Sequence, residues 1–165
     1  MKTGRILLRE HVLEDLDLFC KLQMSSEVGQ YVSWLPRSRE GCEAALLDAI
    51  AQQEVADRQR YFFAVARAED AEFVGSVGYT KTAPDSADFG WFLLKRFWGF
   101  GYATEAVRLL ICRALSDARI QRLSVSAHEE NARSARVAQK CGFRLIRCAH
   151  GRSYFEASRY EFLGR

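Results

Sequence analysis

The sequence predicts one α/β domain spanning residues 1–165, with a mixed, largely antiparallel sheet flanked by helices. Three observations support this prediction. Apolar residues make up 48% of the chain and charged residues 27%, which is the balance of an ordinary globular domain. Strand and helix patterns alternate along the chain, and no repeat, low-complexity tract or linker divides it. A chain of 165 residues buries roughly 70% of its unfolded surface, so it needs no metal or disulfide to hold a core.

The first third of the chain is predicted to form one strand and two helices. Residues 6–8 are a short apolar run, and residues 13–24 place their apolar side chains on one helical face. Residues 34–36, which end in a proline, interrupt the chain. Ser38 is then the expected N-cap of a second helix that runs to about Val55.

The middle of the chain is predicted to form three strands joined by turns. Residues 61–66 and 73–79 are rich in aromatic and β-branched side chains and are separated by a short polar break. Residues 84–86 make the next turn, and residues 88–94 form the third strand.

The last third alternates between helices and strands. An apolar stripe from Ala103 to Ala114 predicts a helix. After a strand at 123–127, Asn131 is the expected cap of another helix that Gly142 ends. Residues 143–148 and 153–163 are predicted to be extended.

Composition excludes several classes of protein. The N-terminal apolar run is too short for a signal peptide, and no segment is apolar enough to span a membrane. The five cysteines lie far apart without a C-x-x-C pair, so we expect buried free thiols, no metal site and a cytoplasmic protein. A net charge of +3 is too small to favour nucleic acid as a partner. The second half carries the positive charge, with 14 basic and 8 acidic residues from position 85 onward, so an anionic ligand is expected there.

A glycine turn between the third strand and the next helix is the most informative segment. Gly99 and Gly101 allow successive backbone N–H groups to face one side, and the following helix adds its unpaired N-terminal donors. Such a turn suits a pyrophosphate. It also occurs as an ordinary strand-to-helix connection. The segment matches neither the P-loop pattern nor the three-glycine dinucleotide pattern, because Thr104 stands where the third glycine would be.

At this turn the sequence resembles the GNAT superfamily of N-acetyltransferases. The cofactor loop of that superfamily reads Q/R-x-x-G-x-G/A, which Arg96, Gly99 and Gly101 match. The likeness is greatest to the RimJ/RimL-type branch, in which the loop commonly reads W-G-x-G-Y-A-T-E-A, as residues 98–106 do here.

Three further segments carry the same resemblance. An N-x-x-S element stands at residues 131–134 and a G-F pair at 142–143, with one helix and one strand between the glycine turn and Asn131. The early Leu8-Arg9 pair and residues 34–36 are also similar to this branch. The resemblance therefore covers nearly the whole chain and implies the acyl-CoA N-acyltransferase fold.

The resemblance implies acetyl-CoA as co-substrate and assigns its binding residues. The loop would cradle the pyrophosphate, and the strand end at Leu93 and Leu94 would pair with the pantetheine arm. Asn131 would bond the pantetheine, unless it only caps its helix, and Ser134 would lie near the thioester sulfur. The loop residues expected to contact the cofactor are Arg96, Gly99, Phe100, Gly101, Tyr102, Ala103 and Thr104.

Acetyl transfer needs a neutral amine, an N–H donor for the carbonyl oxygen and a proton for the thiolate. We expect the donor on the strand near Phe92 or Leu93. Asp88 stands where related enzymes often carry a glutamate base, and Glu130 and His128 are the other candidates. Each of the three is alternatively an exposed polar residue. The tyrosine acid of many superfamily members is replaced by Ala138, which leaves Ser134 or water to serve the sulfur.

Three aromatic residues are expected to line the acceptor pocket. They are Tyr31, Trp34 and Trp91, although Trp91 is also a candidate core residue. The acceptor is expected to be a primary amine on a protein N-terminus, a polyamine or a small molecule, with a slight preference for the N-terminus. The alternative is a catalytically silent acyl-CoA-binding sensor or interaction module. We expect no nucleic acid or membrane partner and a monomer or homodimer.

Overall fold

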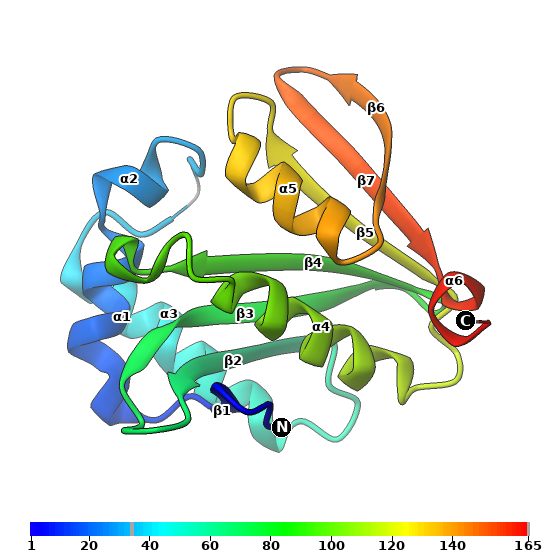
Figure 1. Cartoon of the computed structure of the whole chain (residues 1–165). Helices are drawn as coiled ribbons and strands as arrows, with labels where there is room; N and C mark the ends of the chain where they lie inside the picture. The colour runs from blue at the N-terminus through cyan, green and yellow to red at the C-terminus, as the bar shows by residue number, and fades with distance from the viewer. Residues whose placement is uncertain (34, 165) are drawn as a thin grey trace.

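A seven-stranded sheet forms the centre of the molecule (Figure 1). The computed structural model describes residues 1–33 and 35–164. The strands lie in the order β1-β2-β3-β4-β5-β7-β6, and only the β4–β5 pair is parallel. Their bounds are β1 Ile6–Glu10, β2 Arg60–Arg67, β3 Phe73–Ala83, β4 Ser86–Leu93, β5 Arg122–His128, β6 Arg144–Ala149 and β7 Arg152–Ser158. This mixed, mostly antiparallel sheet confirms the predicted fold class.

Six α-helices of the described residues flank the sheet. They are α1 Leu16–Gln23, α2 Ser26–Gly29, α3 Arg39–Ala51, α4 Tyr102–Leu115, α5 Ala132–Lys140 and α6 Arg159–Leu163. None of the helices in the described part is long and apolar enough to cross a membrane. Side-chain caps begin several of them, since Ser38 Oγ accepts from the N–H of Gly41 and Asn131 Oδ1 from that of Ser134.

The two faces of the sheet are covered by different helices because side chains alternate along each strand. On β2, Phe63 and Val65 face the main core, which includes the inward side of α4. Phe62, one position away, packs instead against a smaller cluster formed by α1 and α3. In Figure 1, α4 and α5 lie over one face of the sheet, with α3 behind β2.

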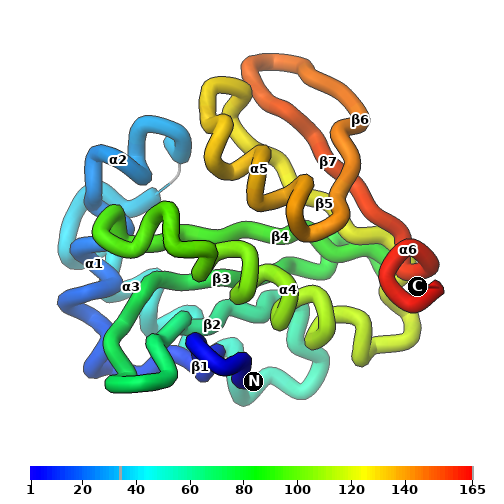
Figure 2. The backbone as a smooth tube through the Cα atoms, viewed as in Figure 1, coloured from blue at the N-terminus to red at the C-terminus, as the bar shows by residue number. Residues whose placement is uncertain are grey.

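The sheet opens into a fork between β4 and β5. These strands pair only from Ser86 to Phe89 on β4, opposite Arg122 to Val125 on β5. Beyond those residues each strand continues without the other, and Figure 2 shows the two backbones moving apart toward their C-terminal ends. One half of the sheet is therefore β1–β4 and the other is β5–β7–β6.

A buried polar network braces the start of the chain. His11 is 1% exposed, and its ring nitrogens lie 3.1 Å from Asp15 Oδ2 and 3.2 Å from Ser76 Oγ. Arg9 donates two hydrogen bonds to the same carboxylate, at 2.8 and 2.6 Å. Burial alone would raise the pKa of Asp15, but the bonds from Arg9, His11 and the Val12 N–H outweigh it and hold that pKa well below its ordinary value.

Most predicted elements are confirmed, and three expectations need correction. Residues 153–163 do not stay extended, because Ser158 begins helix α6 with a capping box in which its N–H donates to Glu161 Oε2 at 2.7 Å. The short helix α2 was not predicted. Cys112 and Cys148 are exposed rather than buried, whereas Cys20, Cys42 and Cys141 are buried as expected.

Candidate functional site

A large cavity lies at the fork in the sheet. Its volume is about 1000 Å³. On one side it is lined by the glycine turn and the starts of α4 and α5, and on the other by α2, α3 and the open face of β4 and β5. A ligand that enters from one side can therefore meet a second ligand that enters from the other.

The glycine turn has the geometry of an anion cradle. Gly99 and Gly101 adopt φ values of 87° and 86°, a left-handed conformation that strains any residue with a Cβ. Gly101 is the N-cap of α4, and no side chain caps the helix there. The first helical hydrogen bond of α4 runs from the Glu105 N–H to the Gly101 carbonyl oxygen. The N–H groups before Glu105 are left for a ligand, and the positive end of the helix dipole favours an anion.

The expected loop residues divide into two groups. Gly99, Gly101 and the residues 102–104 line the cavity. Phe100 does not line it; its side chain is 62% exposed and its carbonyl oxygen accepts from Arg5 Nη2. Arg96 also lies outside the lining, and its guanidinium bonds Glu72 at 2.9 Å. The structure thus brings the backbone of the turn to the cavity, but not these two side chains.

Basic residues surround the glycine-turn side of the cavity. Arg133, Arg136 and Lys140 of α5 line it. The guanidinium carbon of Arg133 lies 5.2 Å from the centre of the Trp98 ring, across the mouth of the fork. The indole N–H of Trp98 donates to the Leu93 carbonyl at 2.7 Å, which fixes the turn to the end of β4. These positive charges suit a phosphate-bearing ligand.

The direction of the backbone N–H groups at the end of β4 follows from one hydrogen bond. The N–H of Leu94 bonds the Val74 carbonyl on β3, and donors alternate in direction along an antiparallel strand. The N–H of Phe92 therefore faces β3, whereas that of Leu93 faces the fork. Leu94 is corrected as a pairing site, because its carbonyl also accepts from the Phe97 N–H. Of the residues expected to supply the donor, Leu93 is the one in position.

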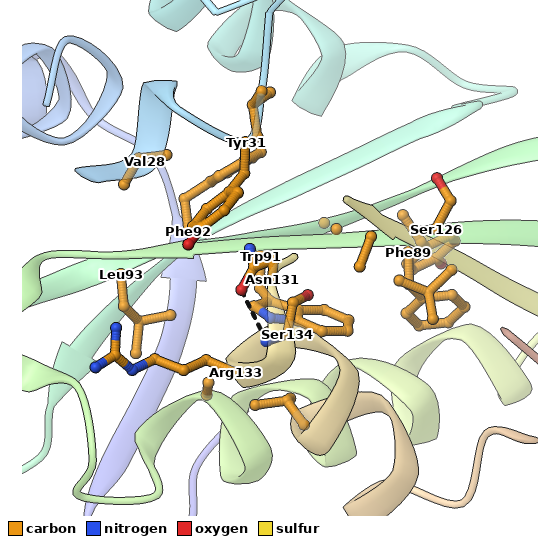
Figure 3. A pocket seen from close by; sticks show the side chains of 18 of the residues that line it. Val28, Tyr31, Phe89, Trp91, Phe92, Leu93, Ser126, Asn131, Arg133 and Ser134 are labelled. Carbon is orange, nitrogen blue, oxygen red and sulfur yellow. Dashed lines mark hydrogen bonds between the residues drawn. The ribbon is translucent and has the colours of Figure 1, made fainter. Parts of the chain in front are cut away.

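Asn131 and Ser134 lie together at the start of α5, on the cavity wall. Asn131 Oδ1 accepts from the Ser134 N–H at 3.1 Å, as the dashed line in Figure 3 shows. The cap therefore occupies the amide oxygen of Asn131 and leaves its NH₂ group for a ligand. Both residues line the cavity, as does Leu93.

The opposite wall contains Tyr31, with its ring centre 5.8 Å from that of His128. Figure 3 shows Tyr31 beside Phe92, on the side of β4 away from Ser134. Trp91 also lines the cavity, but it is paired with Val77 and packs against the main core, so it does so from the α4 side of β4. Its contact with the acceptor stays a prediction. Phe92, which has the opposite orientation, lines the side of β4 that carries Tyr31. Trp34 lies outside the described residues.

Asp88 points into the same side of the fork. It is half-buried, and Ser124 Oγ donates to its Oδ1 at 2.8 Å. Burial raises the pKa of Asp88 above its ordinary value, although the Ser124 bond and the charge of Arg152 oppose the shift. A carboxylate with a raised pKa beside a cavity is a candidate proton acceptor.

The other two candidate bases are less well arranged. Glu130 is exposed on the turn between β5 and α5, at the rim of the cavity. The backbone N–H of Glu130 donates to His128 Nδ1 at 3.3 Å. This bond occupies the Nδ1 atom of His128. Among the described residues no His, Cys, Asp and Glu cluster could hold a metal ion.

Several side chains at the fork had no role predicted from the sequence, among them Arg133 and Arg152. Phe92 was expected only as a backbone donor, and its side chain was missed because a strand pattern does not say which face meets a pocket. Arg133 stands inside the N-x-x-S segment, where only its position beside Asn131 pointed to the site. Arg152 had no local signal, since its side chain reaches the fork from β7 across β5.

Comparison with known proteins agrees with this geometry. Residues 5–144 match the family model described as "Acetyltransferase (GNAT) domain". The chain is 25% identical over 143 residues to the uncharacterized N-acetyltransferase p20 of Bacillus licheniformis, covering 86% of this chain and 80% of that protein.

Two solved structures illustrate the similarity of the fold. A spermidine N-acetyltransferase from Vibrio cholerae, in complex with CoA and spermine, has a TM-score of 0.78 and 16% identity, covering 98% of this chain and 99% of that one. RimL, a ribosomal L7/L12 alpha-N-protein acetyltransferase in complex with CoA, has a TM-score of 0.81 and 16% identity, covering 94% and 95%.

Proposed function

Because this chain belongs to the GNAT acetyltransferase family, we propose that it transfers the acetyl group of acetyl-CoA directly to a primary amine. One observation carries the proposal. At a single fork, an uncapped helix start after two left-handed glycines faces one side of the cavity, and a half-buried carboxylate faces the other. The Leu93 N–H lies between them.

The glycine turn and the basic residues of α5 fit acetyl-CoA. The N–H groups of residues 102–104 would bind the pyrophosphate, with Arg133, Arg136 and Lys140 near the remaining phosphate. The NH₂ group of Asn131 and the backbone of Leu93 would hold the pantetheine arm. When bound, acetyl-CoA supplies a thioester carbonyl carbon for attack by the amine.

Each remaining residue then handles one charge or proton. The Leu93 N–H donates to the carbonyl oxygen as negative charge develops there. Asp88 lies five residues before Leu93 on β4, roughly 16 Å along the strand, so it accepts through bridging water the proton that the amine nitrogen loses when its bond to carbon forms. The carbon–sulfur bond breaks, and the Ser134 hydroxyl donates a hydrogen bond to the departing sulfur. With a thiol pKa of about 8.5, the sulfur needs little more than that.

We propose an α-amine, on a protein N-terminus or a small molecule, rather than a polyamine. The α-amino group of a protein N-terminus, with a pKa of about 7.8, is roughly one quarter neutral at pH 7.4, so a modest base suffices for that acceptor. A polyamine needs several carboxylates, and two on the acceptor side are already paired. Glu27 bonds Lys95 at 3.0 Å, and Asp48 bonds Arg60 at 2.8 Å. Of the two structural neighbours, the RimL name supports this choice and the spermidine N-acetyltransferase name does not.

Membership of the RimJ/RimL-type branch and a cytoplasmic location also remain proposals. The branch is supported by the W-G-x-G-Y-A-T-E-A segment and by the RimL neighbour. The location is supported by five free cysteines, which persist in reducing compartments.

Thermal melting with and without acetyl-CoA tests the proposal, followed by an assay of CoA release with a panel of amines. Ligand at a hundredfold excess over Kd stabilises a folded protein by about 2.7 kcal/mol, so the melting temperature should rise by several degrees. CoA release that depends on an α-amine supports the enzyme. Binding without release across the panel supports the alternative, a silent acyl-CoA-binding module, and no binding overturns both.

A further inference from the structure

The guanidinium of Arg152 lies where β4 and β5 separate. Its Nη2 atom donates to the carbonyl oxygen of Ser126 at 3.2 Å and to Ser126 Oγ at 2.9 Å. The Glu129 N–H bonds Gly151, and alternation along this antiparallel pair turns the Ser126 carbonyl away from β7, toward β4. Since β4 pairs with β5 only as far as Phe89, Arg152 occupies the space that β4 leaves.

The same guanidinium faces the acceptor side of the cavity. The register places Arg152 opposite His128, on the face that also carries Ser124, Ser126 and Asp88. Continued past the last pair, Phe89 and Val125, the parallel register puts Ser126 level with Gly90. Leu93 lies three residues beyond Gly90, which is roughly 10 Å along the strand from the guanidinium that bonds Ser126.

Arg152 forms no ion pair with a carboxylate of the described residues, although its charge acts on Asp88. Both of its hydrogen-bond partners among the described residues are neutral oxygen atoms, and both bonds use the same nitrogen. Asp88, whose carboxylate experiences the charge of Arg152, accepts its hydrogen bond from Ser124 Oγ instead. A half-buried guanidinium with nitrogens left to donate binds carboxylates strongly, because two of its parallel N–H groups match the two carboxylate oxygens.

We propose that the acceptor is a small amino acid whose carboxylate is bound by Arg152 while its amine faces the Leu93 end of the fork. The inference rests on the proposed acetyltransferase function. An amine and a carboxylate on one carbon fit between the guanidinium and a thioester held at Leu93, because the roughly 10 Å between these positions leaves room for one contact at each end of the amino acid. The nearby apolar side chains of Val28, Tyr31, Phe62 and Phe92 suit an apolar amino acid. A polyamine would bring a second cation toward Arg152.

Three acceptors that differ in a single group test whether the carboxylate of the acceptor is recognised. They are leucine, leucinamide and 3-methylbutylamine. We expect the highest kcat/KM for leucine, although the amine of leucinamide has a lower pKa and is more often neutral. A preference for leucine is therefore not explained by the reactivity of its amine. An equal or higher kcat/KM for leucinamide, for the plain amine or for a peptide amidated at its C-terminus overturns the inference.

Arg152 variants separate recognition from structural support. Arg152→Gln should raise the KM for leucine roughly tenfold or more, since a charged hydrogen bond is lost, and leave the KM for acetyl-CoA and for 3-methylbutylamine unchanged. Arg152→Lys keeps the positive charge but not the planar guanidinium, so its KM for leucine should lie between that of the wild type and that of Arg152→Gln. Arg147→Gln is the matched control, because Arg147 stacks on Tyr154 on the same hairpin and does not line the cavity. If Arg152→Gln lowers activity equally with all three acceptors, the inference is overturned, and Arg152 serves to support Ser126 instead.

Calorimetry with CoA-saturated protein gives a reading that does not need turnover. Leucine should bind the wild type and bind Arg152→Gln at least tenfold more weakly, by the same loss of a charged bond. If CoA binds but leucine does not, this inference fails and the acetyltransferase proposal stands. If CoA itself does not bind, the acetyltransferase proposal fails with it.

Discussion

Arg5 and Glu105 form an ion pair that ties the residue before β1 to the first turn of α4. Arg5 Nε lies 2.8 Å from Glu105 Oε1, and Arg5 Nη2 also donates to the Phe100 carbonyl at 3.1 Å. Thr3 Oγ1 donates to the same carboxylate at 3.1 Å. The start of the chain thus holds the glycine turn at its outer side, which leaves the inner side to the ligand.

Removing this pair should weaken cofactor binding without unfolding the protein. We expect Arg5→Gln and Glu105→Gln each to raise the KM for acetyl-CoA several-fold, because the turn loses its outer support. An exposed pair adds little to stability, so the melting temperature without ligand should barely change. The KM for acetyl-CoA of the double variant should rise no more than that of either single variant, since both substitutions break the same interaction. Additive losses would mean that the two residues act separately.

A side chain at Gly101 should disable the anion cradle. Gly101→Ala forces a Cβ into a left-handed conformation, which costs about 1–2 kcal/mol, and the new atom would lie 3.3 Å from Arg5 Nη2. We expect the rise in melting temperature with acetyl-CoA to be largely lost. Gly4→Ala is the control, because its Cβ meets nothing within 4 Å. If the melting temperature of Gly101→Ala rose with acetyl-CoA as much as that of the wild type, the cofactor would have to bind elsewhere than at this turn.

Asp88→Asn should stabilise the protein and slow the reaction. The folded-state pKa of Asp88 is raised by burial, so the folded protein binds this proton more tightly than the unfolded chain does. Stability is therefore lost as pH rises through the window between the two pKa values, and the cost persists above it. The variant should melt at a higher temperature than the wild type at pH 7, and the difference should vanish in acid.

The kinetic part of this prediction is read from a pH profile. Protonation of the acceptor amine lowers kcat/KM at acid pH by itself, so kcat/KM is first divided by the neutral fraction of the amine. In the wild type, this corrected kcat/KM should fall at acid pH with an apparent pKa above the ordinary aspartate value of about 3.9. In Asp88→Asn that limb should disappear along with most of kcat. An unchanged limb would assign the base to another group, of which Glu130 is the remaining candidate.

Ser134→Ala tests the hydrogen bond to the sulfur. We expect kcat to fall about tenfold, below the usual range for a general acid, because the thiolate leaves readily. The KM for acetyl-CoA should change little, since the cap from Asn131 uses the backbone N–H of residue 134. Ser116→Ala, an exposed serine at the far end of α4, is the control. An unchanged kcat in Ser134→Ala would leave water as the partner of the sulfur.

Local chemistry predicted the parts of the site that depend on local geometry. Two glycines before a helix, and an asparagine three residues before a serine, specify a turn and a cap without help from the rest of the fold. The face of Trp91 was a different problem. One step along a strand reverses the direction of a side chain, so only the register with Val77 decides it.

Long-range contacts explain what the sequence left open. Arg152 reaches the fork through the pairing of β7 with β5, and nothing near it in sequence indicates that neighbour. The helix at 159–163 had a local signal that the alternating pattern outweighed, namely the serine and glutamate of a capping box. Helix α2 has four residues, too few for a periodic pattern to identify.

The bracing network at the start of the chain has the connectivity of a hydrolytic triad. Ser76, His11 and Asp15 are joined in that order, yet their exposures are 0%, 1% and 4%. No ester or peptide can reach the hydroxyl, and Arg9 from the other side keeps the carboxylate engaged. A geometric template for serine hydrolases would recognise three residues here that this protein uses as internal scaffolding. The three residues contact one another in the order of a catalytic triad, but because they are buried they serve to hold β1, the first turn and β3 together.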